Sequence, residues 1–204
     1  MRILVVNDYV DQMKYAAQMD NLCAKVEKVS GSSVERVSYE HFGREFVQDQ
    51  IGKYDAVVLS GSEALYSKAE DRLKFQKAIE GTRSLTLPVL GICGGHQLLG
   101  MAYGQNVVNM ERVLRGYYDV TVLVDDPLFD GLNRSILVAE AHREMVERVP
   151  KGFSLLAKSQ DTPVEAMKSE KAAIYGVQFH PERHDEAHPA GGAILANFAK
   201  LARK

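Results

Sequence analysis

The sequence predicts an α/β protein built on a doubly wound, mostly parallel sheet with a small antiparallel addition. In the first half of the chain, apolar strand-like runs alternate with helical patterns, which is typical of a parallel sheet. After Gly104 the pattern changes to short strand-like runs with little helix between them, which predicts the antiparallel part. Because ligand sites of parallel sheets lie at the C-terminal ends of the strands, we expect the functional site at that edge.

The elements of the parallel part follow from their apolar patterns. The expected strands are residues 3–7, 34–39, 54–60, 87–92 and 173–179. A first helix has one apolar face, spaced at helical intervals and formed by Tyr15, Met19, Leu22, Val26 and Val29. Residues 42–51 fit a short helix or a loop. A helix over residues 71–81 has the apolar positions Leu73, Phe75, Ala78 and Ile79, and a helix over residues 191–202 closes the chain.

The antiparallel addition is expected to consist of short strands. They are residues 107–108, 118–124, 136–139, 145–149, 154–157 and 164–167. No repeat or interdomain linker divides the chain, and 204 residues suit one domain, so we expect a single domain over residues 1–204.

The composition narrows the functional class. The net charge of −2 argues against a nucleic-acid partner held by a general basic surface. No apolar run approaches the roughly 20 residues that span a membrane, and we expect no membrane partner. The two cysteines, Cys23 and Cys93, are too few for a disulfide framework, so a reducing, cytoplasmic location is expected. Cys23 falls beside an apolar helix face and is expected to be a core residue.

Cys93 lies at the most informative point of the chain. An apolar strand ends there, Gly91 precedes it, Gly94 and Gly95 follow it, and a helix begins. Strand, sharp turn and helix are the geometry of a nucleophile elbow. The helix start favours the thiolate, which is the nucleophilic form. The same geometry makes the Gly94 N–H a candidate oxyanion donor.

A nucleophilic cysteine needs a base, and the best candidate lies far along the chain. His180 follows the strand expected at residues 173–179, and Glu182 can turn back to hold its imidazole. Thiol, imidazole and carboxylate together form a catalytic triad. His96 is closer to Cys93 in sequence and is the competing base. His184 and His188 add a histidine-rich segment, but Pro181 and Pro189 bracket it and a metal site is not expected.

Two motifs carry a resemblance to a known family. Gly-Ile-Cys-Gly-Gly-His-Gln at residues 91–97 and Gln-Phe-His-Pro-Glu at residues 178–182 resemble the class I, or triad, glutamine amidotransferases. The resemblance covers nearly the whole chain and implies the flavodoxin-like fold of that family, including an antiparallel insertion. Residues 117–198 resemble most the separate glutaminase subunit of GMP synthetases.

The resemblance implies further site residues. The loop at Gly61 and Ser62 would supply a second backbone N–H to the oxyanion hole and contact the substrate, although the family loop is richer in glycine. Gln97 matches a position that helps hold glutamine. His142 matches a loop histidine near the glutaminase site, where the family frequently has Ser-His-x-Asp; here Ala141 and Glu144 replace the serine and the aspartate.

The implied reaction is hydrolysis of the glutamine side-chain amide to glutamate and ammonia. It needs no metal or organic cofactor. Ammonia would pass to a separate ATP-dependent synthetase subunit, because no synthetase domain fits within 204 residues. Conversion of XMP to GMP is the expected use.

Two other functions fit the same residues. A stand-alone hydrolase of γ-glutamyl amides or peptides would use the same triad and turn over without a partner. A non-catalytic regulatory or binding module would keep the fold and bind a partner even after Cys93→Ala. The replacements at Ser62, Ala141 and Glu144 motivate the second alternative, and the intact triad speaks against it.

Overall fold

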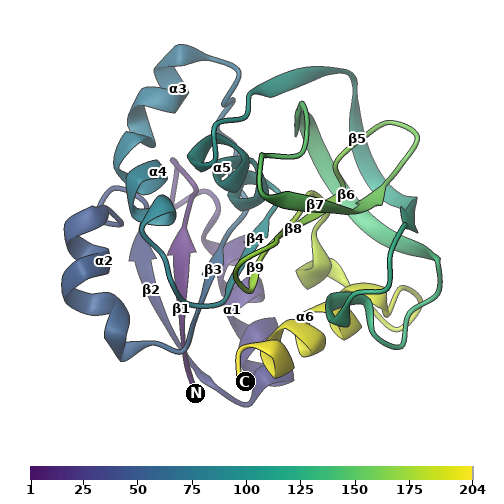
Figure 1. The fold of residues 1–204 in the computed structure, drawn as a ribbon, viewed down its shortest axis with the longest axis horizontal. Helices are drawn as coiled ribbons and strands as arrows, with labels where there is room; N and C mark the ends of the chain where they lie inside the picture. Colours follow the sequence, from purple (N-terminus) through teal and green to yellow (C-terminus); the bar gives the residue numbers. More distant parts are fainter. Residues whose placement is uncertain (204) are drawn as a thin grey trace.

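One mixed sheet runs through the molecule. The structure is a computed structural model, which describes residues 1–203. Within them, nine strands are ordered β2-β1-β3-β4-β9-β8-β7-β5-β6 (Figure 1). The first five strands of this order are parallel to one another, and the remaining pairings are antiparallel. This arrangement confirms the expected α/β fold.

The parallel part is buried on both faces except at its edge strand, which is partly exposed. Its strands are β1 (Arg2–Asn7), β2 (Ser33–Ser38), β3 (Ala56–Leu59), β4 (Val89–Ile92) and β9 (Ile174–Val177). Ile3 and Val5 contribute to the core on one face, whereas Leu4 and Val6 contribute to the core on the other. Successive side chains of a strand point to opposite faces, so a strand covered on both sides reads as a continuous apolar run.

Helices cover the two faces unequally. They are α1 (Ala16–Ser30), α2 (Arg44–Gln50), α3 (Ala69–Lys74), α4 (Gln76–Arg83), α5 (Gly94–Ala102) and α6 (Ala190–Leu201). Buried residues of α1 and α6 belong to one core, and those of α2, α4 and α5 belong to the other. No helix of residues 1–203 has both the length and the apolar character that crossing a membrane requires.

The helix expected over residues 71–81 is two helices, and the expected core position of Leu73 is wrong. The chain bends at Phe75 between α3 and α4. Phe75 is fully buried, stacks on Tyr39 at 4.1 Å between ring centroids and meets Tyr66 edge-on at 5.0 Å. Because these rings hold Phe75 in the core, the preceding helix α3 contributes no buried residue. Its Leu73 is 73% exposed.

The antiparallel part contains fewer and longer strands than expected. They are β5 (Val107–Val122), β6 (Ser135–Val146), β7 (Phe153–Lys158) and β8 (Ala166–Ser169). Each of β5 and β6 joins two runs that the sequence separates, with one irregularity in their pairing between Asn109 and Leu114. The reason is visible in β6, where every even-numbered position from 136 to 146 is buried, yet three of these positions carry polar residues. Inward-facing polar side chains interrupt the apolar pattern without interrupting the strand.

Candidate active site

Cys93 occupies a strained turn between β4 and α5. Its φ of 48° and ψ of −101° make it the one non-glycine residue of residues 1–203 with a positive φ. Its own N–H donates to the Val177 carbonyl at 2.8 Å, and its carbonyl accepts from the Gln97 N–H at 3.0 Å. Strain of this kind persists only where the surroundings fix it. The structure therefore forms the nucleophile elbow that the sequence predicts.

Two glycines after Cys93 let the elbow pack tightly against the end of β3. A Cβ at Gly95 would lie 2.5 Å from the Leu59 carbonyl oxygen, and one at Gly94 would lie 2.6 Å from the Ser62 nitrogen. The Gly95 N–H donates to the Ser60 carbonyl at 2.8 Å. The close approach brings the loop that begins at Ser60 next to the nucleophile.

The sheet brings His180 to Cys93. Strands β4 and β9 are parallel neighbours, so the residues that follow them lie at the same edge. A 3₁₀ turn, η3 (Pro181–Arg183), then folds Glu182 back, and its Oε1 lies 2.7 Å from His180 Nδ1. Both side chains are buried. The predicted partners Cys93, His180 and Glu182 thus meet at one point.

Burial and charge oppose each other in the His180–Glu182 pair. Burial alone would lower the pKa of His180, but the charges of Glu182 and Cys93 outweigh it and raise that pKa. Burial likewise tends to raise the pKa of Glu182, and the charge of His180 lowers it. Nε2 of His180 has no hydrogen-bond partner of good geometry within residues 1–203, although the Cys93 sulfur is near enough to affect the ring. The second ring nitrogen is therefore free to exchange a proton.

Unpaired backbone amides surround the elbow. Within the described residues, the N–H groups of Gly61, Ser62 and Gly94 donate no hydrogen bond. Gly61 also borders the triad, because a Cβ there would lie 3.1 Å from His180 Cε1 and 3.0 Å from the Tyr9 hydroxyl. Unpaired N–H groups beside a nucleophile can hold an oxyanion. The N–H groups of Gly61, Ser62 and Gly94 are therefore candidate donors to an oxyanion, and this role remains a prediction.

A cavity of about 510 Å³ opens over the sulfur. It is lined by five of the predicted residues, namely Cys93, His180, Gln97, Ser62 and His142. It is also lined by Tyr9, Glu63 and Arg183, for which the sequence predicts no role. Part of this lining could have been predicted from the sequence. Tyr9 and Glu63 closely follow expected strand ends, and Arg183 follows the triad glutamate. The cavity is large enough for a small polar substrate.

The Glu63 carboxylate, beside Ser62 in the cavity lining, has a structural role. Its two oxygens accept hydrogen bonds from the N–H groups of Val10 and Asp11, at 3.0 and 2.7 Å. The neighbouring Tyr9 ring stacks on Tyr15 with 4.6 Å between centroids. One wall of the cavity is thereby fixed to the loop that carries Gly61.

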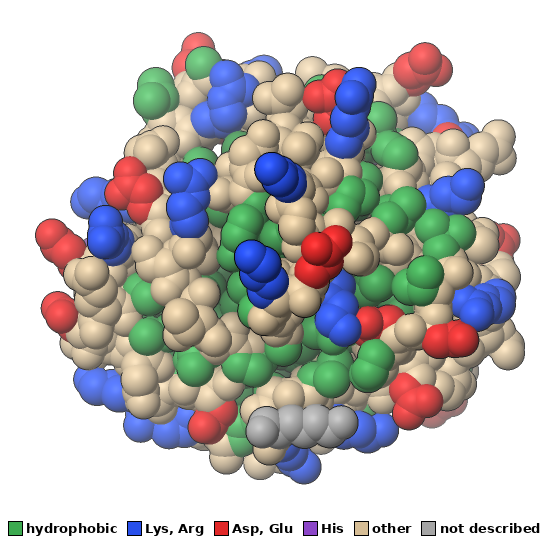
Figure 2. All heavy atoms as spheres, viewed as in Figure 1, with side chains coloured by type: hydrophobic (Ala, Val, Ile, Leu, Met, Phe, Trp, Pro, Cys, Tyr) green, Lys and Arg blue, Asp and Glu red, His purple; other side chains and the backbone are tan. Residues whose placement is uncertain are grey.

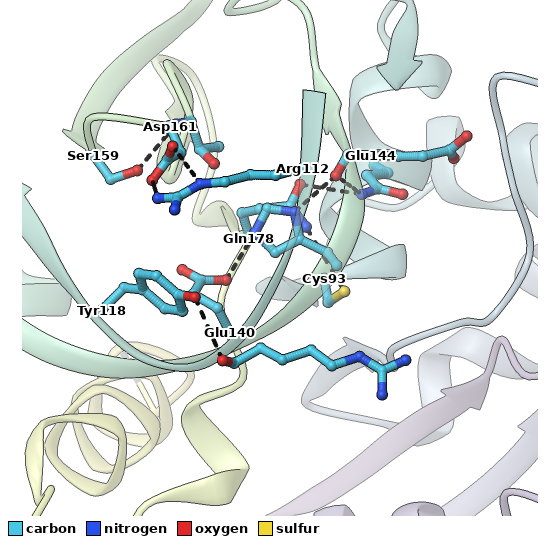
Figure 3. A network of polar contacts seen from close by, with 12 residues as sticks. Cys93, Arg112, Tyr118, Glu140, Glu144, Ser159, Asp161 and Gln178 are labelled. Carbon is cyan, nitrogen blue, oxygen red and sulfur yellow. Dashed lines mark hydrogen bonds and ion pairs between the residues drawn. The ribbon is translucent and has the colours of Figure 1, made fainter. Parts of the chain in front are cut away.

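Gln97 and His142 are held by the protein as well as facing the cavity. Nε2 of Gln97 lies 2.8 Å from the Glu144 carbonyl oxygen and 3.2 Å from Gln178 Oε1 (Figure 3). The nitrogens of His142 face the Glu144 carbonyl and the Glu140 carboxyl, each at 2.9 Å. Contacts of these two residues with substrate therefore remain predictions. Gln178, which the sequence marks only as part of a motif, contacts Gln97 through its Oε1 and Cys93 through its Nε2.

His96 does not compete with His180. It is fully buried, and a Cβ at Gly176 would lie 2.6 Å from its Nδ1, so its ring packs against β9. Burial lowers its pKa to about 3. No group of three or more His, Cys, Asp and Glu side chains in residues 1–203 is arranged to bind a metal ion.

Comparisons with known proteins agree with this geometry. A family model described as glutamine amidotransferase class-I matches residues 5–201. A glutamine-hydrolyzing GMP synthase subunit of Pyrococcus abyssi is 39% identical over 145 residues, which cover 71% of this chain and 74% of that protein. The corresponding subunit of Saccharolobus solfataricus is 31% identical over 191 residues, covering 93% and 96%.

The solved structures give the same result. A crystal structure from Thermoplasma acidophilum, described as a candidate GMP synthase subunit, has a TM-score of 0.82 and 27% identity, covering 100% of this chain and 94% of that one. A glutamine amidotransferase from Thermotoga maritima shares the fold, with a TM-score of 0.66 and 21% identity over 89% of this chain and 76% of that one. The resemblance found in the two sequence motifs is confirmed: the chain belongs to the class I glutamine amidotransferases, enzymes that hydrolyse glutamine.

Proposed function

We propose that this chain is the glutaminase subunit of a two-chain amidotransferase that makes GMP from XMP. The observation that supports the chemistry is the convergence of Cys93, His180 and Glu182 at one edge of the sheet, beneath an open cavity. The observation that supports the product is that the relatives reported above are glutamine-hydrolyzing subunits of GMP synthases.

In the proposed mechanism, His180 Nε2 takes the thiol proton and Cys93 attacks the amide carbonyl of glutamine. The N–H groups of Gly94 and of the segment formed by Gly61 and Ser62 hold the oxyanion. His180 then protonates the leaving ammonia, and a thioester remains. Water, activated by His180, hydrolyses the thioester, and Glu182 holds the ring throughout. No step requires a metal or an organic cofactor.

Ammonia formed in the cavity needs an acceptor, which we assign to a separate ATP-dependent synthetase chain. Side chains around the cavity suit a protein partner: Val113 lines it and is 44% exposed, and Met13, on the loop between Tyr9 and Tyr15, is 90% exposed. Basic and acidic side chains are interspersed over the face shown in Figure 2, without one continuous basic area. We place the enzyme in the cytoplasm, since both cysteines are unpaired and a reactive thiol suits a reducing compartment.

The first experiment tests the nucleophile. The protein is treated with an electrophilic glutamine analogue, and peptide masses are compared with those of Cys93→Ala. One adduct on Cys93 that excess glutamine blocks and that spares Cys23 is the expected result. An unlabelled Cys93, under conditions that label a known glutaminase, would refute a glutamine-reading nucleophile in the isolated chain and favour the binding-module alternative.

The second experiment tests the partner and product. The chain is combined with the ATP-dependent GMP synthetase chain of the same organism, and GMP is measured with either glutamine or ammonium as nitrogen source. Glutamine-dependent GMP formation that Cys93→Ala abolishes, while ammonium still supports it, is the expected result. Rapid glutamine turnover without any partner, and no glutamine-dependent GMP with it, would instead indicate the stand-alone hydrolase.

A further inference from the structure

A buried amide contacts the sulfur of the nucleophile. Gln178 follows β9 and is fully buried. Its Nε2 lies 3.7 Å from Cys93 Sγ, within the range of a hydrogen bond to sulfur (Figure 3). Because an N–H can only donate, the sulfur must be the acceptor in this contact.

The contacts around Gln178 determine which end of its amide faces the sulfur. A backbone carbonyl can only accept, so the Gln97 group 2.8 Å from the Glu144 carbonyl oxygen must be its NH₂. The same NH₂ lies 3.2 Å from Gln178, which must therefore present its oxygen there. The NH₂ of Gln178 is then the end that faces Cys93. This assignment follows from donor and acceptor chemistry alone.

A second chain of contacts fixes the Glu144 carbonyl. His142 Nδ1 lies 2.9 Å from it and must donate, so Nε2 of a neutral ring is an acceptor. Nε2 faces Glu140 Oε2 at 2.9 Å. Burial lowers the pKa of His142 and raises that of Glu140 to about 8. With Nδ1 as the donor, His142 and the Gln97 NH₂ both donate to the Glu144 carbonyl, so these two contacts are compatible.

We propose that Gln178 is a catalytic residue that stabilises the Cys93 thiolate through an N–H···S hydrogen bond, with Gln97 as its positioning residue. The inference rests on the proposed function, in which Cys93 is the nucleophile. A hydrogen bond to the charged form of a group favours that form. The contact therefore assists the step in which the S–H bond breaks and the proton moves to His180 Nε2.

The same contact acts a second time in the reaction. When sulfur is bonded to the acyl carbon in the thioester, it carries no negative charge and the hydrogen bond is weak. When water adds and the C–S bond breaks, the departing electron pair returns to sulfur as thiolate. The Gln178 N–H then meets the developing charge, so both formation and departure of the thiolate are favoured.

The test measures the rate of Cys93 alkylation by iodoacetamide against pH, which requires neither glutamine nor a partner. All variants are made in a Cys23→Ser background, so that one thiol reacts. In Gln178→Leu the midpoint of the profile should rise by about one to two pH units, the effect of losing one hydrogen bond to a charged group. Gln178→Met keeps the length of the side chain and removes the donor without adding a group that titrates, so its midpoint should rise by a similar amount.

Two more variants separate positioning from general damage. Gln97→Leu should raise the midpoint by less than Gln178→Leu, because Gln178 keeps its NH₂ but loses the partner that orients it. Asn197→Leu removes another buried amide, which bonds the Leu128 and Asp130 carbonyls, and should leave the midpoint unchanged. Circular dichroism reports folding; if Gln178→Leu does not fold, Gln178→Met decides. An unchanged midpoint in a folded Gln178 variant would overturn the inference.

Failure of the proposed function would look different. If the glutamine analogue does not label Cys93, yet the alkylation profile shifts in the Gln178 variants, the thiolate contact is real and the glutaminase assignment is wrong. If the analogue labels Cys93 and the profiles of the Gln178 variants match that of the parent, the assignment holds and Gln178 has no electrostatic role.

Discussion

The charge of Glu182 should control the titration of His180. With charge centres about 4 Å apart and an effective dielectric constant of about 20, their attraction is about 4 kcal/mol, or about three pKa units. Burial opposes this attraction, and the net result is the raised pKa of His180. Glu182→Gln removes the charge and keeps the shape of the side chain. The protonation midpoint of His180 should therefore fall by about two to three pH units.

The measurement is an NMR titration of the histidine rings. Because Cys93 also raises the pKa of His180, Glu182→Gln is compared with the parent in a Cys93→Ala background. A fall of less than about half a unit in a folded protein would show that burial, and not the Glu182 carboxylate, sets the state of His180.

Three other substitutions test separate parts of the structure. Cys93→Ala should abolish glutamine hydrolysis in a steady-state ammonia assay, while thermal stability should change little, because alanine keeps the Cβ and with it the backbone strain of the turn; retained activity would exclude the elbow mechanism. Gly95→Ala should cost about 2–4 kcal/mol in urea unfolding, because its Cβ would lie 2.5 Å from the Leu59 carbonyl, whereas Gly52→Ala, with nothing within 4 Å, should be nearly neutral. Burial raises the pKa of Glu165 to about 8 from an ordinary 4.5, so its folded form stays protonated while the unfolded form ionises, and stability should fall as pH rises from about 4.5 to about 8. Glu165→Gln should flatten that decline, and an identical slope in variant and parent would contradict the assignment.

The triad was predictable because its signals are local. The glycines around Cys93 have one structural explanation, and the structure shows the strained turn that requires them. His180 and Glu182 are separated from Cys93 by more than eighty residues, yet both ends are strand ends, and parallel neighbouring strands bring such ends together. Pattern and topology were sufficient here because each residue lies where an apolar run stops.

The bend at Phe75 and the length of β6 were not predictable from periodicity, for opposite reasons. Leu73 and Phe75 both match the apolar face of one helix, but the rings of Tyr39 and Tyr66, which come from other segments, select Phe75 alone. In β6, buried and more exposed positions alternate as in any half-buried strand. Three of the buried positions, however, carry the polar residues Glu140, His142 and Glu144. A pattern scored by hydrophobicity treats those positions as outward or as loop.

The polar inward face of β6 also explains why the role of Gln178 could not be predicted from the sequence: its contacts depend on residues from distant segments. Isolated buried carboxyl and imidazole groups are costly, and they are tolerated where each has a partner of the right kind. Here a neutral imidazole, a carbonyl and two amides alternate as donor and acceptor, and the chain of contacts ends at the sulfur. Each contact before the last joins two groups that take no direct part in the reaction. In the last contact, the donor is the Gln178 amide and the acceptor is the sulfur of Cys93. Removal of the first donor of this chain, as in His142→Leu, should therefore raise the midpoint of the Cys93 alkylation profile, and an unchanged midpoint in the folded variant would contradict this coupling.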